Sequence, residues 1–224
     1  MKLSITASLV SVVALSASVA LLAQDPVKVD PTHYKVLLDN ASVRVLRISY
    51  AAGAKSVMHQ HPDSIMVSLS DSKVKFTMSD GTTQDQAMAN NSAMYAPAGA
   101  HLPSNTGATA VSGILVEFKA AAPGKAALPA SRAGMTLAVL ADGPHGTAYK
   151  STAAPTFAEP AGTKHDFDQV VIALGPEQMS LSIDGKPAKT TWARGDVEFI
   201  GRGVAHEAKN TGGKPVDMVI VAIK

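Results

Sequence analysis

Residues 57–63 read Val-Met-His-Gln-His-Pro-Asp, and the interpretation of the whole chain starts from this stretch. His59 and His61 are two residues apart, so on a β-strand both imidazoles leave the same face. One strand can therefore offer two nitrogen ligands to a single metal ion. A third histidine, His101, follows about forty residues later in the stretch 97–105, where it could fold back beside the pair. These two short segments hold three of the chain's seven histidines.

The residues around the histidine pair alternate in the manner of β-strands. Val74, Phe76 and Met78 fall on one face of a strand, and the turn signal Asp80-Gly81 follows them. Short strands are predicted at 34–38, 43–50, 65–69, 73–79, 84–89, 94–97 and 111–119. Strands this short, with turns this frequent, predict an all-β sandwich or barrel.

The second half of the chain repeats the first. The interval from a histidine to a turn glycine is twenty residues in both halves, 61–81 and 165–185. Ten residues after each turn glycine stands a residue that tolerates a left-handed backbone, Asn91 in one half and Gly195 in the other. Two copies of one β-domain are therefore predicted, at 25–119 and 134–224, joined by an Ala-, Pro- and Gly-rich linker at 120–133.

Residues 1–24 have the features of a secretory signal peptide. Lys2 precedes a largely apolar run at 5–22, and small residues offer cleavage sites at Ala20 and Ala23. A membrane anchor is the alternative, but the run carries four serines and is barely as long as the roughly 20 apolar residues that a span requires. We expect cleavage, and a mature protein that works in the periplasm or is secreted.

The paired histidine segments resemble the double motif of the cupin superfamily. The family's first motif is Gly, five residues, His-x-His, three or four residues, Glu, then Gly, and here Gly53 stands five residues before His59-Gln60-His61. The second motif, Pro-x-Gly-x-x-His-x-x-x-Asn, resembles Pro97-Ala-Gly-Ala-His101-Leu-Pro-Ser-Asn105. The resemblance implies two tandem jelly-roll barrels, with the histidines inside the barrel around a divalent metal.

The chain departs from the family pattern in both halves. The family's glutamate would stand at Ile65 or Met66, and the second motif is one residue short. In the second half Thr163 replaces the first histidine, so His165 and His206 remain. We therefore expect the competent site in the N-terminal barrel. The C-terminal barrel, with its degenerate motif, is expected to serve packing or to bind a ligand without metal.

The predicted metal ligands are His59, His61 and His101. Three neutral imidazoles leave the charge of a divalent ion uncompensated and coordination positions open, and they suit iron, manganese, zinc or nickel without choosing among them. Asp63 is either a group that orients an imidazole or a solvated turn residue. Unperturbed imidazoles titrate near pH 6.5, so metal affinity is expected to fall between about pH 7 and 5.

Two functions stay open at this level. One is metal-assisted chemistry on a small molecule, by oxygenation, isomerisation or hydrolysis, and the intact histidine triplet favours it. The other is a non-catalytic two-barrel protein that binds a small ligand or serves a structural role without metal, and the missing glutamate favours it. Because the sequence identifies no general base, whether the protein is an enzyme is left open.

The composition excludes several kinds of chemistry and makes some binding partners unexpected. The 224 residues include no cysteine, which excludes disulfides, zinc–thiolate sites and thiol nucleophiles. The net charge is +2 with no basic run and few aromatic residues, so nucleic acid is not an expected partner. A small-molecule ligand is expected, a membrane is not expected after signal cleavage, and a homodimer is left open.

Overall fold

The computed structural model describes residues 24–119, 126–128 and 131–224. The predicted signal peptide thus lies outside the described residues, apart from Gln24. Within the described ranges the secondary structure is strands apart from one short helix, α1 (Pro26–Val29). The Asp25 carboxylate caps this helix by accepting from the Val27 N–H at 2.9 Å. Among those residues no helix combines the length and apolar character that a membrane crossing would need.

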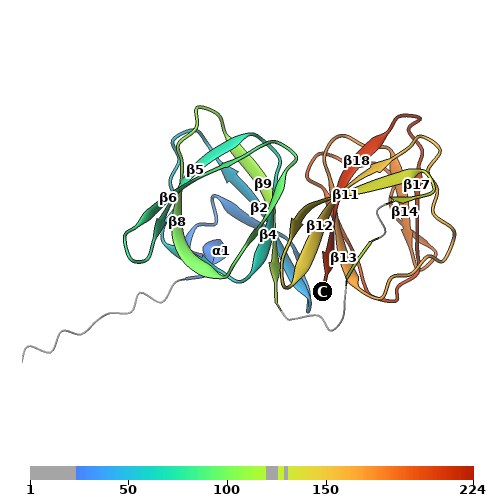
Figure 1. Cartoon of the computed structure of the whole chain (residues 1–224), viewed down its shortest axis with the longest axis horizontal. Helices are drawn as coiled ribbons and strands as arrows, with labels where there is room; N and C mark the ends of the chain where they lie inside the picture. Colours follow the sequence, from blue (N-terminus) through green and yellow to red (C-terminus); the bar gives the residue numbers. More distant parts are fainter. Residues whose placement is uncertain (1–23, 120–125, 129–130) are drawn as a thin grey trace, which may run out of the picture.

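The N-terminal barrel consists of two antiparallel sheets (Figure 1). The five-stranded sheet runs in the order β1 (Tyr34–Asp39), β2 (Val43–Tyr50), β9 (Val111–Phe118), β4 (Ser64–Ser68), β7 (Ala93–Ala96). The four-stranded sheet runs in the order β3 (His59–His61), β8 (Gly99–Asn105), β5 (Ser72–Met78), β6 (Thr83–Met88).

The C-terminal barrel has the same plan. Its six-stranded sheet runs β10 (Ser131–Arg132), β11 (Met135–Asp142), β12 (Gly146–Ala153), β18 (Val216–Ile223), β13 (Asp168–Ala173), β16 (Val197–Ile200). Its three-stranded sheet runs β15 (Lys186–Lys189), β14 (Met179–Ile183), β17 (His206–Asn210). The prediction of an all-β chain with two tandem jelly-roll barrels is confirmed.

The strand registers show that the two halves are equivalent position by position. His59 lies opposite His101 in the first barrel, and Thr163 lies opposite His206 in the second. Asn91 and Gly195 both adopt the left-handed backbone expected of them, with φ of 62° and 79°. Thr163 therefore occupies the place of His59, as the sequence comparison of the halves predicts.

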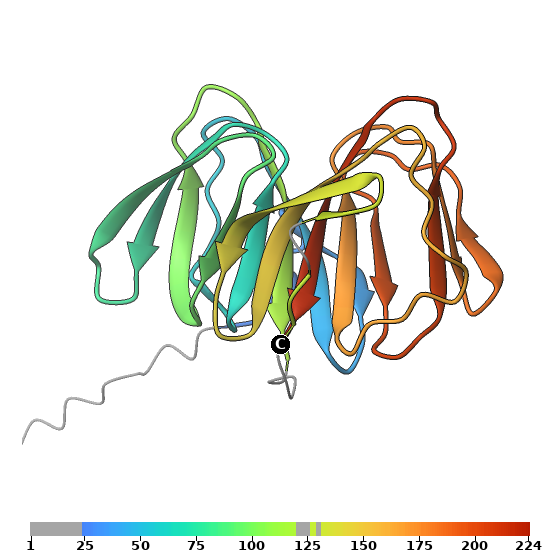
Figure 2. The same ribbon diagram turned by 45° about the vertical axis from the view of Figure 1, so that its right-hand side comes forward.

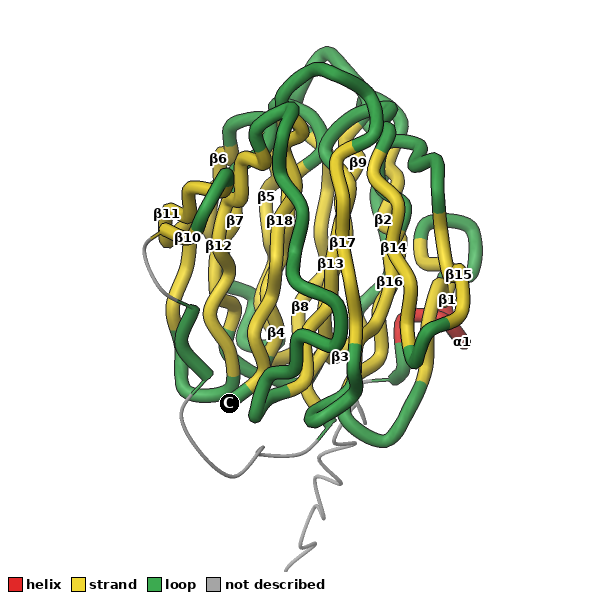
Figure 3. The backbone as a smooth tube through the Cα atoms, turned by 90° about the vertical axis from the view of Figure 1, so that its right-hand side faces the viewer, coloured by secondary structure: helices red, strands yellow, loops and turns green. Residues whose placement is uncertain are grey.

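The two barrels pack against each other through the outer faces of their large sheets. They lie side by side in Figures 1 and 2, and in the end-on view of Figure 3 one lies in front of the other. Alternate side chains of the central strands form one shared buried cluster, which includes Val45, Ile65, Ile114, Val116, Val170, Ile172, Val219 and Val221. Polar bonds also cross between the barrels: Arg194 donates to the Leu69 carbonyl at 2.9 Å, and Arg47 donates to the Gly195 carbonyl at 2.6 Å. Because burying one Val or Ile contributes about 1.5–3 kcal/mol, we expect the two barrels to unfold together.

Part of the predicted linker packs on the C-terminal barrel. Ala126 and Leu128 are buried in a cluster with Tyr149 and Phe167. Residues 120–125 and 129–130 lie outside the described residues. The domain boundaries at 119 and 134 stay predictions.

Candidate metal centre

Three histidines converge inside the N-terminal barrel. Strand β3 alternates as expected: His59 and His61 are 0% and 5% exposed, whereas Gln60 between them faces solvent. Strand β8 pairs antiparallel with β3 and places His101 directly opposite His59. One ring nitrogen from each of the three lies within 4.8 Å of the others. The structure thus brings together the residues predicted as ligands, and their role in binding metal stays a prediction.

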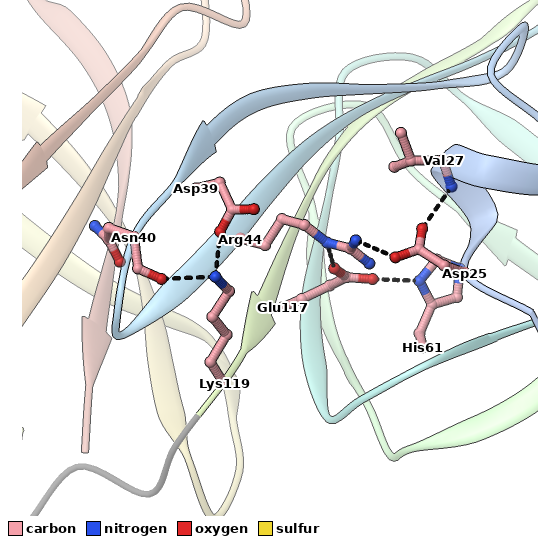
Figure 4. A network of polar contacts seen from close by, with 8 residues as sticks. All are labelled: Asp25, Val27, Asp39, Asn40, Arg44, His61, Glu117 and Lys119. Carbon is pink, nitrogen blue, oxygen red and sulfur yellow. Dashed lines mark hydrogen bonds and ion pairs between the residues drawn. The ribbon is translucent and has the colours of Figure 1, made fainter.

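The His61 imidazole is held by a buried carboxylate from β9. Glu117 is 1% exposed, and its Oε1 lies 2.6 Å from His61 Nδ1 (Figure 4). Its Oε2 accepts from Arg44 Nε at 2.5 Å, and Arg44 also donates to Asp25 at 2.5 Å. Burial alone would raise the pKa of Glu117, but the bonds from His61 and Arg44 outweigh it and hold that pKa below its usual value. The ionised carboxylate fixes Nδ1–H, which leaves Nε2 as the ligating nitrogen.

Sequence reasoning missed Glu117, because the family pattern places its glutamate near the histidine pair. Of the two positions considered, Ile65 lies in the core between the barrels and Met66 lines the cavity of the first barrel. Glu117 enters from a distant strand, opposite Ser64. The sequence feature that could have revealed Glu117 is that it is the single acidic residue in the apolar run 111–118. The orienting role considered for Asp63 belongs to Glu117, since Asp63 accepts from the Ala98 N–H at 2.8 Å and faces His145.

The His59 imidazole lies at the end of a chain of hydroxyl groups. Its Nδ1 is 2.8 Å from the Val57 carbonyl, which can only accept, so Nδ1 carries the proton and Nε2 offers a lone pair. The Tyr34 hydroxyl donates to that Nε2 at 2.9 Å, and the Tyr50 hydroxyl donates to Tyr34 at 2.7 Å. Burial, reinforced by Tyr50, raises the pKa of Tyr34 well above 10, so the hydroxyl keeps its proton. Tyr34 thus occupies the lone pair that a metal would take.

The barrel interior keeps two of the imidazoles neutral. Burial, together with the neighbouring histidines, lowers the pKa of His59 to about 4 and that of His101 to about 3. Neutral imidazole is the form that binds a metal. The site therefore presents these ligands in their binding form at neutral pH.

A cavity of about 110 Å³ lies beside His61 and His101. At 10–15 Å³ per water-sized position it has room for roughly seven to eleven such positions, enough for a small molecule. Its walls are mostly apolar, and none of the described residues that line it is Asp, Glu, Lys or Arg. The apolar side chains include Ile48, Met66, Val74, Phe76, Met88, Met94, Val111 and Leu115.

Replacing Tyr34 by phenylalanine should strengthen divalent-metal binding at this site by about two- to tenfold. The reason is that a hydrogen bond of about 0.5–1.5 kcal/mol to His59 Nε2 no longer competes with the ion. Titration of the metal-free protein with Co²⁺ measures the change. Tyr149→Phe removes a hydroxyl in the other barrel and should leave this affinity unchanged; weaker binding in Tyr34→Phe would instead make the hydroxyl part of the metal site.

Comparison with known proteins supports the fold. No protein-family model matches the sequence, and no curated protein is significantly similar to it. The chain superposes on a cupin 2 conserved barrel domain protein from Leptotrichia buccalis at 13% identity and TM-score 0.56, covering 85% of this chain and 88% of that one. It also superposes on salicylate 1,2-dioxygenase from Pseudoaminobacter salicylatoxidans at 11% identity and TM-score 0.60, covering 83% and 70%.

A third similar structure is oxalate decarboxylase from Bacillus subtilis, a protein with Mn(II) centres, at 10% identity and TM-score 0.58, covering 82% and 69%. At these identities the likeness shows the fold and not the activity. The chain has the fold of two-barrel cupin proteins, so the expected resemblance to the cupin superfamily is confirmed at the level of the fold.

Proposed function

We propose that the N-terminal barrel is a divalent-metal centre that oxygenates a small, largely apolar molecule, in a protein exported to the periplasm or beyond. One observation carries the proposal: three histidines, of which His59 and His61 are buried and His101 is partly buried, converge within 4.8 Å beside a cavity with mostly apolar walls. The similar fold of a salicylate 1,2-dioxygenase supports this choice of chemistry. Export rests on the first 24 residues of the sequence.

The donor set fits a divalent ion. Three neutral nitrogen ligands without thiolate suit iron, manganese, zinc or nickel. Such an ion would supply open coordination positions and, in the case of iron or manganese, redox chemistry. His59, His61 and His101 would hold it, and Glu117 would keep His61 in its ligating orientation.

The protein's own groups favour oxygenation over proton-transfer chemistry. The Glu117 carboxylate is bound to both His61 and Arg44, so it is not a free base. Among the described residues, the cavity walls include no carboxylate and no amine, and their apolar side chains would exclude water from the bound molecule. The Tyr34 hydroxyl is a donor at the centre that could hydrogen-bond an oxygen of the substrate.

Metal analysis of untagged mature protein tests the proposal. We expect His59→Ala, His61→Ala and His101→Ala each to lower the divalent-metal content by one ion per chain, because a catalytic site of this kind needs three protein ligands. The control His145→Ala, which changes a histidine at the barrel interface, should keep the content of the parent protein.

Oxygen uptake by the iron-loaded protein, measured with a panel of small aromatic and aliphatic compounds, then tests the reaction. Consumption that disappears in His61→Ala supports oxygenation. Metal binding without oxygen uptake would favour the non-catalytic ligand-binding alternative. A parent protein that binds no divalent metal at this site would overturn the proposal.

A further inference from the structure

We infer that the C-terminal barrel contains a second divalent-metal site, formed by Glu159, His165 and His206. Two imidazoles and one carboxylate are a donor set that binds iron(II), manganese and zinc. The inference is independent of the reaction proposed for the first barrel. From sequence alone the second barrel offers two histidines, and the structure adds Glu159, which lies outside both motifs.

The three side chains converge within metal-binding distance. One ligand atom from each lies within 4.8 Å of the others, and Glu159 Oε2 is 3.6 Å from His206 Nε2. Two ligands bound to one ion at about 2.0–2.1 Å are separated by roughly 3.0–3.4 Å, so small side-chain shifts would close the site. Glu159 and His206 are 7% and 4% exposed, and His165 is partly buried, so most of the site is shielded from solvent.

The fold explains why Glu159 reaches this place. The segment before Thr163 runs beside β17, since the Glu159 N–H donates to the Ala208 carbonyl at 2.8 Å. His206 begins β17 and lies opposite Thr163, the position that holds a histidine in the first barrel. Glu159 thus supplies the ligand that Thr163 cannot, and His165 lies with its ring 5.1 Å from that of His206.

One unsatisfied polar atom of this cluster points to a bound ion. His165 Nε2 is buried and has no hydrogen-bond partner. Buried polar atoms are nearly always paired, and an orphan costs about 1–3 kcal/mol, so a bound ion would explain this nitrogen. Arg132 donates to Glu159 Oε1 at 2.5 Å and the Ala208 N–H donates to Oε2 at 3.2 Å, which together orient the carboxylate with Oε2 toward His206.

The second site would differ from the first in the charge of its ligands and in the size of the adjoining cavity. A carboxylate ligand compensates one of the two charges of the ion, whereas the three imidazoles of the first barrel compensate none. The adjoining cavity, lined by Arg132, Glu159 and His206, is about 40 Å³ and holds roughly three or four water-sized positions. The site therefore suits an ion with one or two water-sized ligands and not the larger substrate of the first barrel.

Titration of untagged protein with Co²⁺ tests the inference in a His59→Ala/His61→Ala background, which removes the first site. Calorimetry and the visible absorption of bound Co²⁺ should show one ion per chain. Adding Glu159→Gln should weaken this binding at least about tenfold, because even groups that only orient a ligand cost 10–100-fold when changed. The matched control Glu207→Gln changes the neighbouring residue of β17, on the opposite face, and should have no effect.

A second variant guards against misfolding. Glu159→Gln also breaks the pair with Arg132, whereas His165→Ala removes a ring whose Nε2 has no partner and should leave that pair intact. Circular dichroism confirms that each protein is folded. Absence of Co²⁺ binding in the double-alanine background, or unchanged binding in His165→Ala, would overturn the inference, whatever the outcome for the first barrel.

Discussion

Replacing Glu117 by glutamine should lower the free energy of unfolding by about 3–5 kcal/mol and weaken metal binding at the N-terminal site by about 10–100-fold. The carboxylate accepts from His61 with one oxygen and from Arg44 with the other. An amide has one acceptor oxygen, so its NH₂ group would face either His61 Nδ1–H or the Arg44 guanidinium. One buried donor then has no acceptor, and the His61 ring is free to turn away from the metal.

Chemical denaturation of the metal-free protein measures the stability, and Co²⁺ titration measures the affinity. Glu207→Gln is the matched control, because it makes the same chemical change on a partly exposed strand of the other barrel. If Glu117→Gln left both quantities unchanged, the carboxylate would have no role in orienting His61. Loss of stability with full metal affinity would restrict its role to pairing with Arg44.

Acidification from pH 7 to pH 4 should destabilise the metal-free protein by several kcal/mol. Burial lowers the pKa of His59 to about 4, of His101 to about 3 and of His165 to about 4, against about 6.5 in an unfolded chain. At a pH between the folded and the unfolded pKa values, the unfolded state binds more protons than the folded state. The free energy of unfolding therefore falls as pH drops below about 6.5. The loss levels off near pH 3–4, once the folded state is protonated too.

The lowered pKa of Glu117 adds to this loss, because a carboxylate stabilised in its ionised form loses that stabilisation as pH falls below about 4.5. Urea unfolding at pH 7, 5.5 and 4 in the presence of a chelator measures the effect. His101→Leu should show a shallower decline than the parent protein, since it removes one of the imidazoles whose pKa the barrel interior lowers. Equal declines in both proteins would contradict the assigned cause.

The same pKa values change the pH range expected for metal binding. Free imidazoles predict that protons displace metal between about pH 7 and 5. Because His59 and His101 resist protonation until about pH 4 and 3, a chelator should still lower the melting temperature at pH 5. Burial inside the barrel, which sequence spacing does not reveal, accounts for the difference.

Local patterns were sufficient to predict the strands and the repeat. The alternation of apolar and polar residues in 74–78 and the turn at Gly81 depend on backbone geometry within a few residues, so the sequence alone predicts them. The shared face of His59 and His61 follows from the same two-residue period. Their approach to His101 was predictable because a family motif records that pairing.

Tertiary structure alone decided which carboxylates join the histidines. Glu117 meets His61 because β4 and β9 pair in one particular register and the sheet closes into a barrel. Glu159 reaches His206 because its segment runs beside β17. Strand pairing between distant segments is set by the packing of the whole barrel and not by the residues next to each acid. The sequence by itself therefore determined the strands and the shared face of the histidine pair. The closed barrels decided which carboxylate joins each histidine cluster, and burial inside them lowers the pKa values of the histidines.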